Sequence, residues 1–304
     1  MPPVGPRVST VVVSFNTREH LLRCLASLET VVLPLEVIVV DNASADGSPE
    51  AVAERFPATR VVPNAENAGF ARASNQGLAL ARAPHVLLLN SDAEVRPGAV
   101  EAMAALLDAR PRVGAVGPRT LGSDGSVQVS FGPPLTPLNE WRQRRLVQGV
   151  RAREAAALGR AAALAAVEHE PAWLSASCLL ARREALAAVG GFDEAFFLYE
   201  EDVDLCRRLR QAGWTLVFTP EAEVVHHLGR SMEQAPERAR LEYHRSHLRY
   251  YRKHNGRVAT ALLRTWLAAT AAGRWLASWA RRGPDGERVR RRQGDVLRLA
   301  LFGR

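Results

Sequence analysis

The sequence predicts an α/β fold in which a mostly parallel, twisted sheet is flanked by helices and followed by a helical carboxyl-terminal extension. Apolar, β-branched runs alternate with amphipathic segments over about 120 residues, the pattern of parallel strands joined by right-handed helical crossovers. Hydrophobic residues make up 47% of the 304, enough to bury a full core. Polar turn residues follow several of the runs, and ligands of such sheets bind at the carboxyl ends of the strands.

The predicted elements of the first half follow in order. Residues 8–14 are β-branched and apolar, as expected for a strand covered on both faces. Residues 17–28 place four leucines on one helical face. The same alternation predicts strands at 35–40, 60–62, 85–89 and 113–117, a helix containing Val52 and Phe56, and helices at 69–81 and 97–109.

The second half is less regular. Glycines and prolines in 118–140 predict a loop or short hairpin, and the Ala- and Arg-rich segment 141–168 predicts a helical insert. A strand at 172–180 and a helix near 183–189 lead to an acidic cluster at 200–204. We expect residues 1–120 to form a nucleotide-binding half, residues 121–256 an acceptor and catalytic half of the same domain, and residues 257–304 a basic amphipathic tail.

The net charge of +8 is confined to that tail. Residues 257–304 contain 11 Arg and 3 acids, whereas 1–256 contain equal numbers of basic and acidic residues. This distribution argues against a nucleic-acid groove through the core and favours a tail that meets an anionic surface. Apolar residues at helical spacing after Arg257 predict an interfacial helix, although a helix packed on the domain has the same pattern.

The three cysteines have no Cys-x-x-Cys spacing, so the sequence predicts neither a disulfide framework nor a zinc site, as in a reducing cytoplasm. The amino-terminal residues do not have the pattern of a signal peptide. No apolar stretch reaches the ~18 residues that span a bilayer. We therefore expect a cytoplasmic protein, soluble or peripheral on the inner face of the membrane.

Polar and aromatic residues follow the predicted strands. Ser14, Phe15 and Asn16 end the first strand and Asp41 ends the second, so they open onto one crevice where Phe15 can stack on a base and Asp41 can accept a hydrogen bond. A buried Phe and a turn-forming Asp are the alternative. In 64–77, Asn67 caps a helix whose face carries Arg72 and Asn75, which are either ligand contacts or ordinary solvated positions.

Three further groups have the chemistry of catalysis. Asn90-Ser91-Asp92 follows an apolar strand, where Asp92 can hold Mg²⁺ or Mn²⁺, although such residues also form plain turns. Asp202 shares a helical face with Leu205, Cys206 and Leu209, which points it inward as a candidate general base; the helix dipole alone is the alternative. Of the adjacent His226 and His227, strand alternation allows one to face the site, and we choose His226 as a metal ligand.

Taken together, these segments resemble the inverting nucleotide-sugar glycosyltransferases of family 2, and among them the bacterial rhamnosyltransferase-like members. The resemblance covers roughly residues 8–255 and rests on segments in the family's order: Val12 to Asn16, Val40 to Ser44, Asn67 to Ala71, Leu89 to Asp92, Gly190 to Glu194, Glu201 to Leu205, and His226 to Ser231.

The resemblance implies a GT-A fold and transfer of a sugar, rhamnose or a similar hexose, from a nucleoside diphosphate to a hydroxyl of a glycan or lipid-linked acceptor in cell-envelope polysaccharide synthesis. It implies that Phe15 and Asp41 contact the base, that Asn67 and Arg72 contact the nucleotide or donor sugar, and that Asp202 is the base. Asp92 would bind a divalent cation with His226 nearby. The family's Asp-x-Asp motif begins here with Asn90, which puts strict metal dependence in doubt, and Glu201 is a rival base.

Other classes fit less well. A dehydrogenase would need Gly-x-Gly-x-x-Gly after the first strand, where Ser14-Phe15-Asn16-Thr17 stands, and the chain has no Gly-Lys-Ser/Thr phosphate loop. A non-catalytic nucleotide-sugar-binding scaffold of the same fold remains an alternative, but it would have little use for an inward Asp202.

Overall fold

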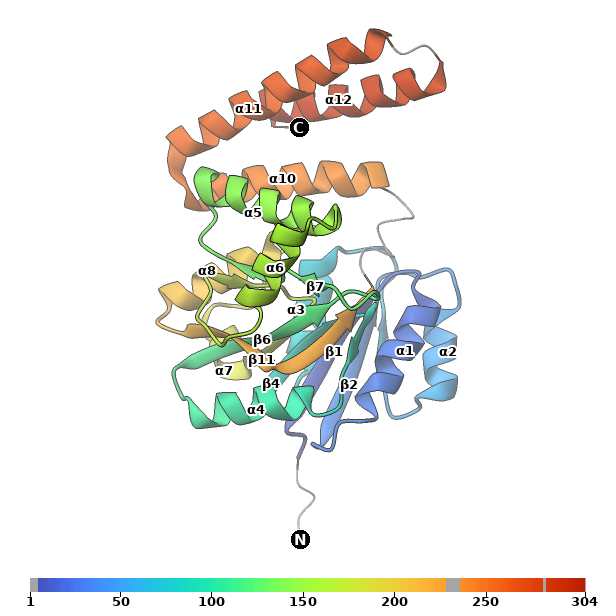
Figure 1. Ribbon diagram of the computed structural model, residues 1–304. Coiled ribbons are helices and arrows are strands. Elements are labelled where there is room, and N and C mark those ends of the chain that lie inside the picture. The colour runs from blue at the N-terminus through green and yellow to red at the C-terminus, as the bar shows by residue number, and fades with distance from the viewer. Residues whose placement is uncertain (1–4, 228–235, 281–282, 304) are drawn as a thin grey trace. The chain divides into compact units, whose positions relative to one another are not determined.

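The computed structural model describes residues 5–227, 236–280 and 283–303 (Figure 1). Through residue 121, strands and helices alternate as predicted apart from the short strand β5, which was not predicted, and most element ends differ from the predicted ones by one or two residues. The elements are β1 (Val8–Ser14), α1 (Arg18–Leu28), β2 (Leu35–Asp41), α2 (Ser48–Arg55), β3 (Arg60–Pro63), α3 (Phe70–Leu80), β4 (His85–Asn90), β5 (Ala93–Val95), α4 (Ala99–Ala109) and β6 (Val113–Leu121).

The predicted loop or hairpin of 118–140 is a hairpin in which β7 pairs antiparallel with β6, and the predicted insert forms two helices. The predicted strand at 172–180 divides into β9 and β10, because residues 175–177 leave the extended conformation. The second half contains β7 (Val127–Gln128), β8 (Phe131–Gly132), α5 (Pro137–Arg151), α6 (Ala155–Leu164), β9 (Trp173–Leu174), β10 (Cys178–Arg182), α7 (Arg183–Ala188), α8 (Glu201–Gln211), β11 (Thr215–His226), α10 (Pro236–His254), α11 (Gly256–Ala277), η1 (Ser278–Ala280) and α12 (Pro284–Phe302).

The main sheet has the strand order β3-β2-β1-β4-β10-β6-β11-β5, with β7 added beside β6. Strands β3, β2, β1 and β4 are mutually parallel, and β10 enters antiparallel between β4 and β6. One buried layer joins α1 and α4 to the sheet, and a second joins α3, α7 and α8 to its other face. Helices therefore cover both faces, which explains the nearly unbroken apolar character of β1 and β4.

The chain divides into two compact units. One contains the described residues up to 195 and from 201 to 227, and the other contains 196–200 and the described residues from 236 onward. The predicted domain boundary at residue 256 assigned α10 to the first domain. In the structure, however, Leu248 of α10 packs with Leu267 of α11 and Leu299 of α12. The second unit thus begins before residue 256, because α10 supplies one side of this small core.

The segment 196–200 belongs to the second unit through its own contacts. Ser246 of α10 donates a hydrogen bond to the carbonyl of Leu198 at 2.7 Å. The buried His247 lies 2.9 Å from the carboxylate of Glu200. Tyr199 and Glu200 both adopt positive φ, of 70° and 63°, a conformation that costs non-glycine residues about 1–3 kcal/mol each and that surrounding contacts must hold.

We expect Gly77→Ala to lower stability. Gly77 lies in α3 against Val11 of β1, and a Cβ there would overlap the Val11 side chain. Such overpacking of a core costs about 1–3 kcal/mol. The matched control is Gly159→Ala in α6, where a Cβ meets nothing within 4 Å and the helix gains about 1 kcal/mol. Urea unfolding measures both; a Gly77→Ala protein as stable as wild type would contradict the packing described here.

Candidate active site

The carboxyl ends of three parallel strands form the floor of the site. Ser14 of β1 pairs with Asp41 of β2, and Val13 pairs with Asn90 of β4, so Ser14, Asp41 and Asn90 lie side by side. A chain of hydroxyl contacts runs from Ser14 to Thr17 at 3.2 Å and from Thr17 to Ser91 at 2.9 Å. These bonds tie the loop after β1 to the loop after β4.

The loop after β2 is fixed by the loop after β1. The amide of Asn16 donates to the Ser44 hydroxyl at 2.9 Å, and the Asn16 side-chain oxygen accepts from the amide of Ala45 at 2.7 Å. Asn16 has a φ of 51°, in the left-handed region that Asn tolerates better than most residues. Phe15 beside it is partly exposed.

Asp41 combines burial with an unused acceptor. Its Oδ2 accepts from the amide of Ser44 at 2.9 Å, and the residue is 3% exposed. Within the described ranges, no donor reaches its buried Oδ1. Because a buried carboxylate oxygen without a donor is costly, this atom is suited to accept a hydrogen bond from a ligand.

The segment before α3 depends on a residue that the sequence analysis did not single out. Asn42 accepts from the amide of Ala68 at 3.2 Å and from the Asn64 side chain at 2.9 Å, and its own amide donates to the carbonyl of Gly69. The sequence signal that could have identified Asn42 is its position between Asp41 and Ser44, in the polar loop after the second strand. Asn67 does not cap α3 as predicted, because the N-cap residue is Gly69. The Asn67 side-chain oxygen accepts from the amide of Gly69 at 3.0 Å and so shapes the turn before the helix.

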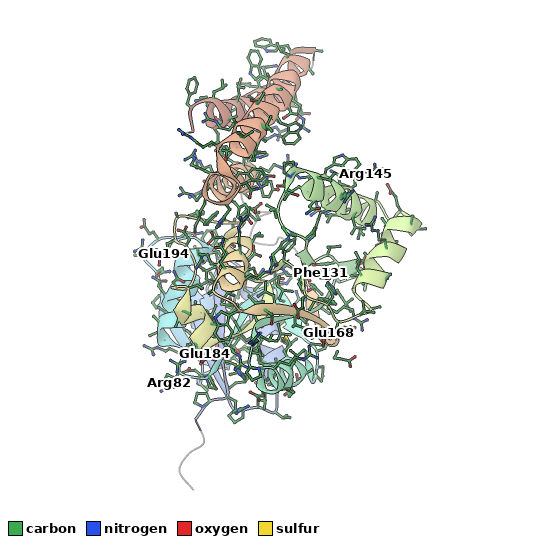
Figure 2. The ribbon with its side chains drawn as sticks, turned by 90° about the vertical axis from the view of Figure 1, so that its left-hand side faces the viewer. Arg82, Phe131, Arg145, Glu168, Glu184 and Glu194 are labelled. Carbon is green, nitrogen blue, oxygen red and sulfur yellow. The ribbon has the colours of Figure 1, made fainter. Side chains whose placement is uncertain are left out.

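The two α3 residues proposed as donor contacts differ in their surroundings. Arg72 is exposed. The Asn75 amide donates to the carbonyl of Phe192 and to Glu194, and its oxygen accepts from the amide of Phe192 at 2.9 Å. Figure 2 shows Glu194 on the side of the unit where α3 lies. Asn75 therefore fixes the loop after α7, and these bonds do not bring it to the strand-end residues.

Asp92 and His226 meet although they are far apart in the chain. His226 Nε2 lies 3.1 Å from Asp92 Oδ1 and 3.3 Å from the side-chain nitrogen of Asn90, and both Asp92 and His226 are buried. His226 reaches this position because β11 pairs with β5, where it lies opposite Ala93. His227 points elsewhere, 2.7 Å from Glu94 and 2.8 Å from Ser123. Residues 228–231, the rest of the His226 to Ser231 motif, lie outside the described residues.

A buried thiol lies beneath this pair. Cys24 of α1 donates to the carbonyl of Asn90 at 3.5 Å. Burial raises the pKa of Cys24 well above its ordinary value, and the negative charge of Asp92 raises it further. Cys24 therefore stays a neutral thiol at physiological pH and provides packing at this site without adding charge.

Asp202 is anchored at the same end of the sheet. Its Oδ2 accepts from the amide of Ala176 at 3.1 Å, and its Oδ1 accepts from the amide of Val203 at 2.8 Å. The next residue along, Ser177, accepts at its carbonyl from the amide of Asn90 at 2.9 Å. Two adjacent residues of the break between β9 and β10 thus connect Asp202 to the Asn90-Ser91-Asp92 turn.

The inward face of α8 differs from the predicted one. Asp204 is fully buried and binds Arg208 at 2.7 Å, whereas Asp202 is only partly buried. Arg208 donates also to the carbonyl of Val189. The helical-face argument for Asp202 was therefore incomplete: the amides of Ala176 and Val203 fix its carboxylate, and the residue is partly exposed. Glu201 is buried.

Asp92 and His226 are suitable ligands for a divalent cation, since one supplies a carboxylate oxygen and the other an imidazole nitrogen. No cluster of three ligating side chains occurs within the described ranges. A cation at this position would need its remaining ligands from a substrate or water, as is usual for Mg²⁺ held against phosphates.

Comparison with known proteins identifies the family. The model of Glycosyl transferase family 2 matches residues 9–164. The chain is 35% identical, over 78% of its length and 81% of the relative's, to N-acetylglucosaminyl-diphospho-decaprenol L-rhamnosyltransferase of Mycobacterium tuberculosis. The chain belongs to glycosyltransferase family 2. This confirms the family indicated by the sequence motifs, and the protein is a glycosyltransferase of a family that inverts configuration at the anomeric carbon.

Solved structures confirm the GT-A fold of this family 2 glycosyltransferase. Mannosyltransferase PcManGT from Pyrobaculum calidifontis, in complex with GDP-Man and Mn²⁺, superposes with a TM-score of 0.61 at 20% identity over 100% of this chain and 89% of that one. TarS residues 1–349 of S. aureus superpose with a TM-score of 0.55 at 17% identity over 97% and 90%. At these identities the likeness concerns the fold.

Proposed function

We propose that this glycosyltransferase moves rhamnose from a nucleoside-diphosphate donor to a hydroxyl of a lipid-linked acceptor in cell-envelope polysaccharide synthesis. The observation that carries the proposal is the attachment of Asp202, through Ala176 and Ser177, to the turn that contains Asp92. The rhamnosyltransferase relative supports the choice of sugar and of acceptor class. A non-catalytic scaffold is not favoured, because it would not need a partly exposed carboxylate fixed beside this turn.

The donor would bind across the strand ends. Asp41 Oδ1 would accept a hydrogen bond from the nucleotide base, and Phe15 would stack on that base. Asn67 and Arg72 would contact the nucleotide or the donor sugar. Ser14, Asn16 and Asn75 would act mainly by holding the loops that surround the donor, as their hydrogen bonds indicate.

Asp202 would act as general base. It takes the proton from the acceptor hydroxyl while that oxygen attacks the anomeric carbon and the bond to the diphosphate breaks, so the sugar inverts and the nucleoside diphosphate leaves with the bonding electrons. Asp92 and His226 would hold a divalent cation, Mg²⁺ or Mn²⁺, which when bound neutralises charge on the leaving diphosphate. Asn90, whose side chain lies 3.3 Å from His226, would contact the nucleotide-sugar donor.

The proposed acceptor also suggests where the protein works. Among the described residues, no helix has the length and apolar content needed to cross a bilayer. We expect peripheral contact with the inner face of the membrane through residues 257–304, whose basic charge complements anionic lipids.

A donor panel tests the proposal. Purified protein with a lipid-linked acceptor is given dTDP-rhamnose, UDP-glucose or UDP-galactofuranose, and transfer to the lipid is measured with release of nucleoside diphosphate. We expect acceptor-dependent release from the rhamnose donor. Release from another donor only would refute the choice of sugar, and no transfer from any of them would refute the proposed reaction.

A further inference from the structure

The carboxyl-terminal unit contains a cavity of about 560 Å³ lined by α10, α11 and α12. Arg240 of α10, Arg274 of α11 and Arg292 of α12 contribute to its lining. Arg238 of α10 also lines it, so arginines from three different helices surround one hollow. All of the lining residues belong to this unit.

The positive charge of the cavity is only partly balanced. Arg240, Arg274 and Arg292 form no ion pair with a carboxylate in the described part of the chain. Two acids also line the cavity, and one of them, Asp295, already binds Arg298 at 3.1 Å. Glu237 is the other.

The electrostatics of Arg292 reflect this crowding. Burial lowers the pKa of Arg292 most, Arg240 and Arg274 lower it further, and Glu237 opposes them. A bound anion would relieve the repulsion between these arginines, and the guanidinium fork matches phosphate oxygens.

The rest of the wall is apolar. Leu267 and Val296 are buried at the cavity, and Trp266, which is 49% exposed, stands at its side. Leu262 and Val258 lie four and eight residues before Trp266 on the same helix and are 63% and 75% exposed. Residues spaced by four share one face of a helix, so an exposed apolar strip leads along α11 to the arginines.

We propose that this cavity binds the phosphate or diphosphate headgroup of a lipid whose apolar chain lies along Val258, Leu262 and Trp266. An apolar strip next to an arginine-lined hollow fits an amphiphile better than a free inorganic anion. The proposal rests on the proposed function for the identity of the lipid, a polyprenyl diphosphate. It adds a binding site in the helical unit for that acceptor class.

The test uses the full chain and phosphatidylcholine vesicles doped with undecaprenyl diphosphate. We expect Arg274→Gln with Arg292→Gln to weaken binding about tenfold, as expected when charge-assisted bonds to phosphate are lost. The control removes the same charge from α11 and α12 outside the cavity, with Arg257→Gln and Arg291→Gln, and should change binding less than about twofold. Circular dichroism confirms that each variant is folded.

A second variant separates a lipid from a free anion. Trp266→Ser should weaken binding to the doped vesicles and leave binding of inorganic pyrophosphate unchanged. Vesicles given the same surface charge with phosphatidylglycerol should bind the wild type and the cavity variant with affinities that differ less than on diphosphate vesicles.

If the cavity variant and the control variant weakened vesicle binding equally, binding would depend only on the overall basic charge, and the proposal would be overturned. Unchanged binding by the cavity variant would overturn it as well. If Trp266→Ser had no effect on the vesicles, the ligand would be a free anion. Sugar transfer by the wild type is measured in separate vesicles that contain a polyprenyl-diphosphate-linked glycan as the hydroxyl acceptor, with the dTDP-rhamnose donor added. If the cavity arginines were needed for lipid binding but no sugar were transferred, the proposed function would be refuted and the cavity site would be supported. If sugar were transferred but lipid binding did not depend on the cavity arginines, only the proposed site would be refuted.

Discussion

Asp202→Asn is expected to lower kcat by about 10²–10⁴-fold, the usual contribution of a general base. The amide cannot take the acceptor proton, but it keeps the size of the carboxylate and can still accept a hydrogen bond from the amide of Ala176. Donor affinity should stay near the wild-type value, because the donor contacts proposed above lie on other loops. Steady-state kinetics and calorimetric titration of the donor measure the two quantities separately.

Two neighbouring carboxylates serve as controls. Glu201→Gln tests the rival base, and its kcat should fall much less than that of Asp202→Asn. Asp204→Asn removes a buried partner of Arg208, so it should lower stability, by about 3–5 kcal/mol as for a broken buried ion pair. If Asp202→Asn turned over near the wild-type rate while Glu201→Gln lost activity, the base would be Glu201.

Asp92→Ala is expected to abolish most of the effect of Mn²⁺ on donor binding, with at least about tenfold weaker donor affinity in the presence of the ion. Asp92 supplies the carboxylate of the proposed cation site, and its Oδ1 lies 3.1 Å from His226. Removal leaves His226 as the main protein ligand. Titration calorimetry of the donor with and without Mn²⁺ measures the difference directly.

The matched control is Asp108→Ala, which removes an exposed aspartate on α4 that pairs with Arg7 and His85 at the amino ends of β1 and β4, opposite the carboxyl ends that form the site. It should leave the effect of Mn²⁺ unchanged. Wild-type donor affinity with Mn²⁺ in Asp92→Ala would show that Asp92 is not a ligand. If Mn²⁺ did not change the donor affinity of the wild type, the reaction would be independent of the metal, consistent with Asn90 standing in place of the family's usual Asp.

Most of the first half was predictable because its signals are local. A β-branched run such as Val8–Ser14 has one stable place, in a sheet covered on both faces, and the leucines of α1 have the period of a helix. The order of parallel strands then puts Ser14, Asp41 and Asn90 at one edge. The family motifs could be recognised in the sequence because they too are local signals.

The remaining features depend on contacts between distant segments. Nothing in the local sequence indicates that the amide of Ala176 would hold Asp202, or that the break between β9 and β10 would reach Asn90. The helical period alone did not separate Asp202 from Asp204, because Arg208 stabilises the buried carboxylate from the next turn. The Asn42 side chain forms hydrogen bonds with Asn64, Ala68 and Gly69 in the segment before α3, which only the tertiary structure shows.

The central claim is that Asp92 and Asp202 act on the same sugar-nucleotide. A crystal structure of Asp202→Asn with Mn²⁺ and the intact donor tests it most directly, because this variant should bind the donor without consuming it. The account predicts Mn²⁺ bound to Asp92 between the protein and the diphosphate, with residue 202 facing the anomeric carbon from the side opposite the leaving group. A donor bound elsewhere, or residue 202 separated from the sugar by packed side chains, would contradict it.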